Sequence, residues 1–385
     1  MSPCLWPPPR RFSCAPADDD DDESAGTFLD DDDGSGVVPD DDGNDGEDDD
    51  DDSATDDDAD DDVISPSYAA VSAQGQISAI VAAVEGEMMF ATDTRHDEVI
   101  ILDTEDFEVQ DRIPVGLMPV DIDMNPGGYR FWVATRGETA VTWVDNGSKG
   151  QGTVDLQHHP VAIAIGGNGK VYVVNDAGGI EILDEYAQEY LTEVTWDDGI
   201  PSPSMIAVDR GGLRALVANA GISPASVMRI DLYNDDLNIE EVNETGSLGS
   251  NGQSLTLAPD GDSFVFPCGS GNGPGDAVYQ INTLNFKQSF GEYDIGTYPR
   301  YLTFDPFGAF AVGINGDPHD QRVYVLNPES LEKGSVIDVT DWLAENDEEP
   351  KIVEMNADGT VLVLYAENST GGTGTFYLVE RKWLQ

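Results

Sequence analysis

The sequence predicts an all-β fold built from seven copies of one four-stranded antiparallel unit. Three observations predict it. An apolar run that ends on an acid or an amide recurs seven times between residues 69 and 385. A glycine precedes the second run of every copy, and the seventh copy ends after its third run. Such units, with a period of roughly 40 to 50 residues, are typical of a seven-bladed β-propeller.

The third strand of each unit is the clearest marker of the repeat. Apolar alternation that ends in a turn-forming residue predicts a strand followed by a turn. The acids at these ends (Asp103, Asp145, Asp184 and Asp231) are expected to accept backbone N–H groups in Asx-turns and to have no catalytic role. The third strands are expected at residues 99–103, 141–145, 180–184, 227–231, 278–282, 323–327 and 376–380.

A tight hairpin is expected between the first and second strands of each unit. The stretch from His159 to Asp184 shows the pattern, with V-A-I-A-I followed by the turn G-G-N-G and the run V-Y-V-V. Glycine and asparagine are favoured in such turns because they adopt left-handed backbone conformations readily. The glycines that open the seven second strands are Gly86, Gly128, Gly169, Gly212, Gly261, Gly308 and Gly359.

A weaker stretch after each third strand is expected to form an outer fourth strand, as at residues 109–115 and 191–196. The seventh unit lacks this stretch, because only five residues follow Glu380. Residues 68–73 precede the first unit, and we expect them to supply the missing strand beside residues 376–380. Pairing the two ends closes the ring and removes its last open sheet edge.

The repeat resembles the YVTN-type β-propeller repeat, named for its second strand, which here reads Tyr172-Val173-Val174-Asn175. The Pro-Asp-Gly turn of that family stands at residues 259–261, and its Pro-Arg opening stands at Pro299-Arg300. The resemblance covers about residues 68–385 and departs from the pattern at Pro267-Cys268. It implies a seven-bladed fold, distantly similar to that of 6-phosphogluconolactonase-like lactonases, and a non-enzymatic binding role.

The first 62 residues are expected to form a disordered acidic tail, with the propeller occupying residues 63–385. The chain carries a formal net charge of -58, and the tail holds 26 acids against two arginines. Low hydrophobicity and blocks of like charge oppose a packed core in the tail. The polyanionic surface excludes nucleic acid as a partner, because phosphates repel it. No stretch is long and apolar enough to predict a transmembrane segment. We also expect the protein to be a monomer.

Cys14 stands shortly before the acidic run, which begins at Asp18. That arrangement resembles a mature bacterial lipoprotein, in which a lipidated cysteine begins a tether, although Arg11-Phe12-Ser13 departs from the usual lipobox. A lipid anchor at Cys14 and an extracytoplasmic location, in the periplasm or at the cell surface, are therefore expected. Of the three cysteines only Cys268 lies in the folded part, so a disulfide framework is excluded.

One face of the predicted ring gathers the scarce basic groups. In a propeller, the turns between second and third strands share a face with the connections from each outer strand to the next inner strand. Histidine there suits proton transfer or metal coordination, and arginine suits an anionic ligand. The candidates for binding a small anionic ligand or a protein partner are Arg95, His96, Arg136, His158, His159, Arg300 and His319. Asp317 and Asp320 are candidates for holding Ca²⁺, the alternative being a solvated turn.

Three functions are open at this point, because the fold alone does not decide among them. The first is a non-enzymatic extracytoplasmic binding or scaffold protein, tethered through its acidic tail and without a cofactor. The second is a lactonase-like hydrolase. In it, the arginines on the face that gathers the basic residues orient an anionic sugar lactone, and a histidine activates water. The third is a calcium-dependent surface or matrix protein. No catalytic residue is assigned, since no nucleophile triad, Walker loop, zinc spacing or dinucleotide fingerprint is present.

Overall fold

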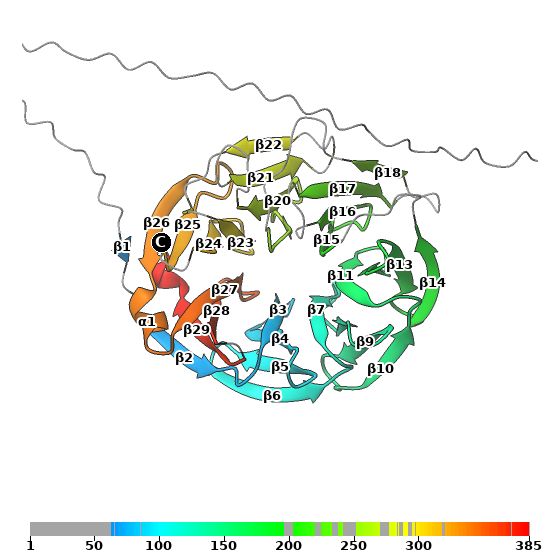
Figure 1. The fold of residues 1–385 in the computed structure, drawn as a ribbon, viewed down its shortest axis with the longest axis horizontal. Coiled ribbons are helices and arrows are strands. Elements are labelled where there is room, and N and C mark those ends of the chain that lie inside the picture. The colour runs from blue at the N-terminus through cyan, green and yellow to red at the C-terminus, as the bar shows by residue number, and fades with distance from the viewer. Residues whose placement is uncertain are drawn as a thin grey trace, which may run out of the picture. The chain divides into compact units, whose positions relative to one another are not determined.

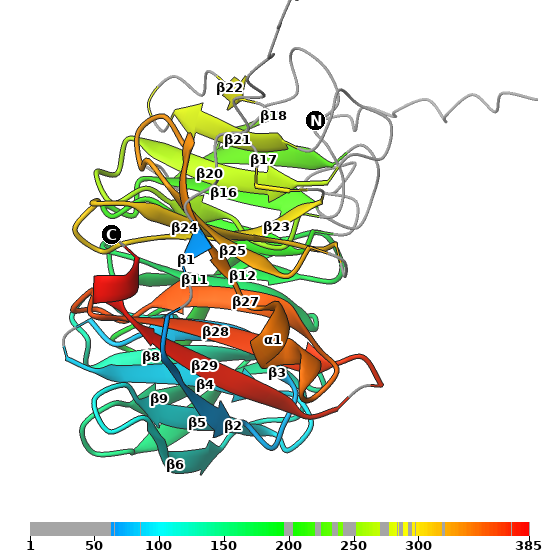
Figure 2. The same ribbon diagram turned by 90° about the vertical axis from the view of Figure 1, so that its left-hand side faces the viewer.

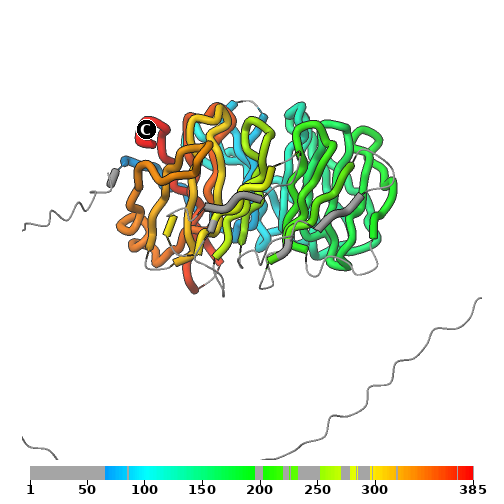
Figure 3. Tube along the Cα trace, turned by 90° about the horizontal axis from the view of Figure 1, so that it is seen from above, coloured from blue at the N-terminus to red at the C-terminus, as the bar shows by residue number. Residues whose placement is uncertain are grey.

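The computed structural model describes residues 63–64, 66–84, 86–195, 203–219, 225–232, 238–241, 252–269, 277–282, 284, 288–291, 295–296, 298–317, 320–370 and 372–384. These residues form seven sheets, each built on four antiparallel strands, that stand around a common centre (Figure 1). Seen from its edge, the ring has strands that run between its two faces (Figure 3). The predicted all-β, seven-bladed propeller is therefore confirmed.

Each blade is named here by its order in the chain, and its strands are given from the inside outward. Blade 1 has β3 (Ile77–Ala82), β4 (Met88–Asp93), β5 (Glu98–Asp103) and β6 (Glu108–Pro114). Blades 2 and 3 have β7 (Pro119–Met124), β8 (Arg130–Thr135), β9 (Ala140–Asp145) and β10 (Gln151–Asp155), then β11 (Pro160–Gly166), β12 (Lys170–Asn175), β13 (Ile180–Asp184) and β14 (Glu189–Val194).

The next two blades follow the same order. Blade 4 has β15 (Met205–Val208), β16 (Arg214–Asn219), β17 (Ser226–Asp231) and β18 (Asn238–Glu241), and blade 5 has β19 (Thr256–Leu257), β20 (Ser263–Cys268), β21 (Ala277–Asn282) and β22 (Gln288–Gly291). Blade 6 has β23 (Pro299–Phe304), β24 (Ala311–Asn315), β25 (Arg322–Leu326) and β26 (Lys333–Asp338). Blade 7 has β27 (Glu348–Met355), β28 (Val361–Asn368), β29 (Gly374–Glu380) and, from the other end of the chain, β2 (Tyr68–Ser72).

The two ends of the propeller meet in blade 7, as the sequence predicts. β2 runs antiparallel to β29 with Tyr68 opposite Val379 and Ser72 opposite Thr375 (Figure 2). The ladder continues one residue further, where the Ala73 N–H donates to the Gly374 carbonyl at 2.9 Å. Ala73 is fully buried. The last blade therefore obtains its outer strand from the N-terminal side of the chain, and the ring is closed.

Three elements at blades 6 and 7 were not predicted, and one of them is a short 3-10 helix, η1 (Arg381–Trp383), directly after β29. β1 (Val63–Ile64) adds a short parallel strand to the outer edge of β26. Helix α1 (Thr340–Ala344) buries Trp342 and Leu343 between blades 6 and 7. The Trp342 ring lies 4.3 Å from that of Tyr68 in the closing strand, measured between centroids. A helix of five residues is too short to produce a helical period in the sequence.

The glycines that open the second strands have the backbone conformation that their turns demand. All seven have φ between 61° and 83°, a region that other residues enter only at a cost. Some of these glycines also give room to the preceding blade. A Cβ atom on Gly128 would lie 3.0 Å from Cβ of Val84, which belongs to the turn of blade 1. The predicted hairpin turns are therefore confirmed.

The apolar side chains pack between neighbouring blades. Trp132 in blade 2 is fully buried against Val171 and Val173 of blade 3. Tyr172 on the other face of blade 3 packs with Val217 of blade 4. Because each sheet buries both faces against its neighbours, a ring of this length needs no single central core.

The acids that end the third strands behave in two ways. Asp103 and Asp184 each accept two backbone N–H groups from the following turn, at 2.7–3.1 Å, as expected for Asx-turns. Asp145 and Asp231 instead form ion pairs with Arg130 and Arg229, at 2.8 and 2.9 Å. β20 also continues without interruption through Pro267 and Cys268, where the sequence departs from the YVTN pattern.

Within the part of the chain that the structure describes, no helix has the length and apolar character needed to span a membrane. Residues 1–62, with the predicted anchor Cys14, lie outside the described residues, as does His319.

Candidate functional site

The inner strands of the seven blades surround the centre of the ring (Figure 1). Two cavities lie among these strands, and the space that they occupy is called the channel below. One cavity of about 270 Å³ lies within it, and a second of about 190 Å³ shares the lining residues Asp121, Thr256 and Tyr301. The first is lined by residues 79–81, 121–123, 163–165, 206–208, 255–257, 301 and 354. The volumes suit a small molecule or a hydrated ion rather than a peptide.

Two aspartates of β7 face the channel because of the geometry of an inner strand. β11, the inner strand of the next blade, has a sheet partner on one side only, so half of its N–H groups need another acceptor. Asp121 accepts the Ile163 N–H at 2.8 Å, and Asp123 accepts the Ile165 N–H at 2.7 Å. Each aspartate also accepts the N–H of its own neighbour on β7.

A third acid, Glu354 of β27, lies on the same channel. Its Oε1 accepts a hydrogen bond from the Thr303 hydroxyl at 2.7 Å. Tyr301 also lines the channel, and burial together with the charge of Glu354 raises the pKa of its hydroxyl group. The described linings of both cavities include three carboxyl groups, Asp121, Asp123 and Glu354, and contain no lysine, arginine or histidine.

The three carboxyl groups hold protons more tightly than exposed acids do. Burial raises the pKa of Asp121 and of Asp123 from 3.8 to about 7, against the opposing effect of their N–H donors. Burial likewise raises the pKa of Glu354 from 4.5 to about 7. All three side chains keep partial contact with the channel space, so water tempers this effect. The channel therefore carries a negative charge that depends on pH near neutrality.

Sequence reasoning missed these acids, although a signal was present. The inner strand P-V-D-I-D-M alternates acidic and apolar residues, and K-I-V-E-M carries a single acid. Once such segments are assigned to inner strands, an acidic side chain on them can be expected to face the channel. The sequence-based prediction instead selected the basic residues of the turns.

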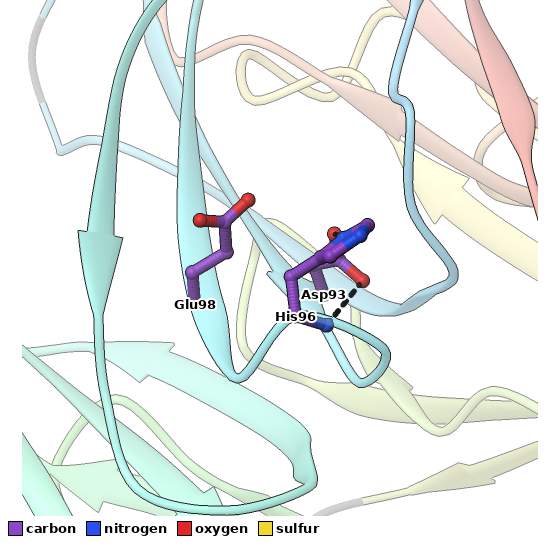
Figure 4. Close-up of side chains that lie close together, drawn as sticks. All are labelled: Asp93, His96 and Glu98. Carbon is purple, nitrogen blue, oxygen red and sulfur yellow. Dashed lines mark hydrogen bonds and ion pairs between the residues drawn. The ribbon is translucent and has the colours of Figure 1, made fainter.

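Arg95 and His96 lie in the turn between β4 and β5, as predicted. The Arg95 guanidinium donates to the carbonyl of Gly372, between β28 and β29 of blade 7. The His96 imidazole lies against Asp93, with Nδ1 at 2.7 Å from Oδ2, and Glu98 begins the next strand (Figure 4). One potential ligand atom from each of Asp93, His96 and Glu98 falls within 4.8 Å of the others.

Three of the remaining candidates each contact a different group. His158 Nε2 lies 3.5 Å from Glu193, and His159 Nδ1 lies 3.1 Å from the Glu138 carbonyl. Arg300 donates to the Pro350 carbonyl at 3.3 Å, and burial lowers the pKa of its guanidinium. Arg136 is exposed. No hydrogen bond or ion pair in the described part of the chain joins two of the predicted basic residues.

The predicted calcium ligands are engaged in the turn itself. Asp320 Oδ2 accepts hydrogen bonds from Asn315 at 2.8 Å and from the Tyr324 hydroxyl at 2.6 Å. Arg322 lies 3.5 Å from Oδ1 of the same carboxylate. The N–H of Asp317 donates to the Asn315 side chain at 3.1 Å. This arrangement favours the alternative of a turn held by its own hydrogen bonds.

Comparisons with known proteins support the fold and leave the function open. No protein-family model matches the chain, and no curated protein matches it. Its fold is similar to that of a solved structure described as hydrazine synthase from Kuenenia stuttgartiensis, with a TM-score of 0.59 at 18% sequence identity. The match covers 77% of this chain and 94% of that chain. At this identity the likeness shows the propeller fold alone.

Proposed function

We propose that this chain is a non-enzymatic binding protein whose central channel takes a small organic ammonium ion. The observation that carries the proposal is the composition of the channel, where three carboxyl groups face the cavities and the described lining has no basic side chain. Carboxylates attract a cation more strongly inside a protein than in bulk water, because the protein interior screens charges less than water does. An ammonium ion also brings several N–H donors for carboxylate and hydroxyl oxygens.

The ligand proposed here is a cation, whereas the basic candidates selected from the sequence favour an anion. Those residues are absent from the described lining of both cavities, and their side chains are engaged with partners outside that lining, at Gly372, Glu193 and Pro350. Tyr301 lines both cavities and adds an aromatic ring to their walls, a group that attracts cations.

The raised pKa values of the three acids give this binding a characteristic pH dependence. Below about pH 7 the carboxyl groups carry protons, which a cationic ligand has to displace. Affinity should therefore rise between pH 6 and pH 8, by up to about tenfold per pH unit for each proton released.

Isothermal titration calorimetry at pH 8, where the three acids are mostly ionised, tests the proposal on the full chain with methylammonium, ethanolammonium and 1,4-diaminobutane. We expect saturable binding of at least one of these ions, and a loss of about tenfold or more in Glu354→Gln, because a charged partner is removed. The matched control is Glu189→Gln, an exposed acid on the outer strand of blade 3. Equal binding by wild type and Glu354→Gln for every ion would reject the channel as the site.

We also propose that the repeat is of the YVTN type and that the protein works outside the cytoplasm, held at a surface through its acidic tail. The Tyr172–Asn175 segment supports the first point, and the composition of residues 1–62 with Cys14 supports the second. Deleting residues 1–62 should release the protein from a membrane or cell-surface fraction into the soluble fraction. Unchanged fractionation would contradict the tether.

A further inference from the structure

We propose that Asp93, His96 and Glu98 form a binding site for a divalent transition-metal ion, in which Arg112 supplies the positive charge when no metal is bound. The site lies on blade 1, and none of its residues lines the described channel cavities, so it is independent of the function proposed above. It combines one imidazole and two carboxylates, a donor set that suits Zn²⁺ and its neighbours better than Ca²⁺.

The backbone brings the three ligands together. Asp93 is the last residue of β4 and Glu98 the first of β5, and the two pair directly across the ladder. His96 lies in the turn that connects β4 to β5 (Figure 4). The potential ligand atoms lie within 4.8 Å of one another, so small side-chain rotations would bring them to the roughly 3–4 Å separations of a shared metal with bonds of about 2 Å.

Asp93 is already oriented as a ligand. Its side chain is fully buried, and its Oδ1 accepts the backbone N–H groups of Gln76 at 3.0 Å and Arg95 at 2.9 Å. Its Oδ2 is directed at the His96 ring. A carboxylate with one oxygen fixed by N–H donors and the other directed to an imidazole has the support that metal ligands require from their surroundings.

The two carboxylates of the cluster face a single guanidinium, so a bound cation would meet a net negative charge. Arg112 Nη1 lies 2.5 Å from Glu98 and 4.0 Å from Asp93, so one guanidinium faces two carboxylates. Its Nη2 donates separately to the Ala73 carbonyl at 2.7 Å. A metal ion can therefore take the Nη1 position on Glu98 while Arg112 remains attached to Ala73. The His96 side chain is 46% exposed, which lets water complete the coordination.

Titration of the full chain with Co²⁺, followed by its visible absorption, tests the site. We expect saturable binding with the spectrum of nitrogen and oxygen ligands, weakened at least about tenfold in His96→Ala. The matched control is His159→Ala. His159 contacts the Glu138 carbonyl and belongs to no group of potential metal ligands among the described residues, so this variant should bind Co²⁺ like wild type. The acidic tail is identical in all variants, so any Co²⁺ that it binds contributes equally to every titration.

Two further variants separate a metal site from a purely structural ion-pair network. Glu98→Gln removes a ligand and should weaken Co²⁺ binding. Arg112→Gln removes the competing cation and should tighten binding by roughly fivefold or more, as expected for a unit charge about 4 Å away. A structural network predicts lower stability in both variants and the same Co²⁺ affinity as wild type. That result, or equal Co²⁺ binding by wild type and His96→Ala, would overturn the proposal; His96→Ala and Glu98→Gln decide it if Arg112→Gln does not fold.

Discussion

Removing the closing strand should open the propeller at blade 7. The perturbation is deletion of residues 1–73, which takes away β2 and leaves β29 with an unpaired edge. Deletion of residues 1–66 is the matched control, because it removes the acidic tail and β1 but leaves β2 in place. The comparison isolates the contribution of the strand that joins the two ends of the ring.

The magnitude follows from the contacts that β2 makes. Five residue pairs join it to β29. At a net value of about 1 kcal/mol for each hydrogen bond, such a ladder contributes on the order of 5 kcal/mol. Contact of Tyr68 with Trp342, with ring centroids 4.3 Å apart, adds about 1 kcal/mol. Because the free energy of unfolding of a folded domain is only about 5–15 kcal/mol, this loss is a large fraction of it.

Urea denaturation and size-exclusion chromatography provide the assay. We expect the 1–66 deletion to keep a denaturation midpoint close to that of the full chain, since β1 contributes two residue pairs only. The 1–73 deletion should show a much lower midpoint and should self-associate through the exposed edge of β29. If the 1–73 deletion is monomeric and has the same midpoint as the 1–66 deletion, the closure has no energetic role and the reasoning fails.

The turn glycines and the channel acids yield two more predictions. Gly128→Ala should destabilise the fold more than Gly86→Ala in urea denaturation, because both have positive φ but only the Gly128 Cβ would press on Val84, at 3.0 Å; equal losses would show that backbone strain alone matters. The free energy of unfolding should fall as pH rises from about 4 through about 7, because the three channel carboxyl groups bind protons more tightly in the folded state than in the unfolded one. We expect on the order of 1 kcal/mol for each group after screening by channel water, and a weaker pH dependence in a triple variant with Asp121→Asn, Asp123→Asn and Glu354→Gln; an unchanged pH dependence in that variant would contradict the assignment.

The repeat was predictable from the sequence because it rests on local constraints. A left-handed turn favours glycine, so Gly86, Gly128 and their five counterparts mark the hairpins in the sequence itself. Alternating apolar runs mark the strands, and the missing outer strand of the seventh unit predicted the pairing of β2 with β29. Closure could be inferred because an open sheet edge is unfavourable wherever the chain offers a strand to cover it.

The candidate sites depended on distances between blades, which no local pattern contains. Sequence reasoning selected His96 but could not find its grouping with Asp93 and Glu98, since those acids are also expected in any strand-ending turn. It selected Arg95, His158 and Arg300 as one group, and the fold gives them contacts with Gly372, Glu193 and Pro350. The rotation from one blade to the next sets which side chains face each other.

The sequence by itself determined the number of blades, the order of their strands and the way the ring closes, because local conformation and apolar alternation act over a few residues. Only the tertiary structure decided what lines the centre. Asp121, Asp123 and Glu354 come from inner strands of blades 2 and 7, and they face one channel because the ring brings those strands together. Their charge, pKa and availability to a ligand follow from burial, which the whole ring creates.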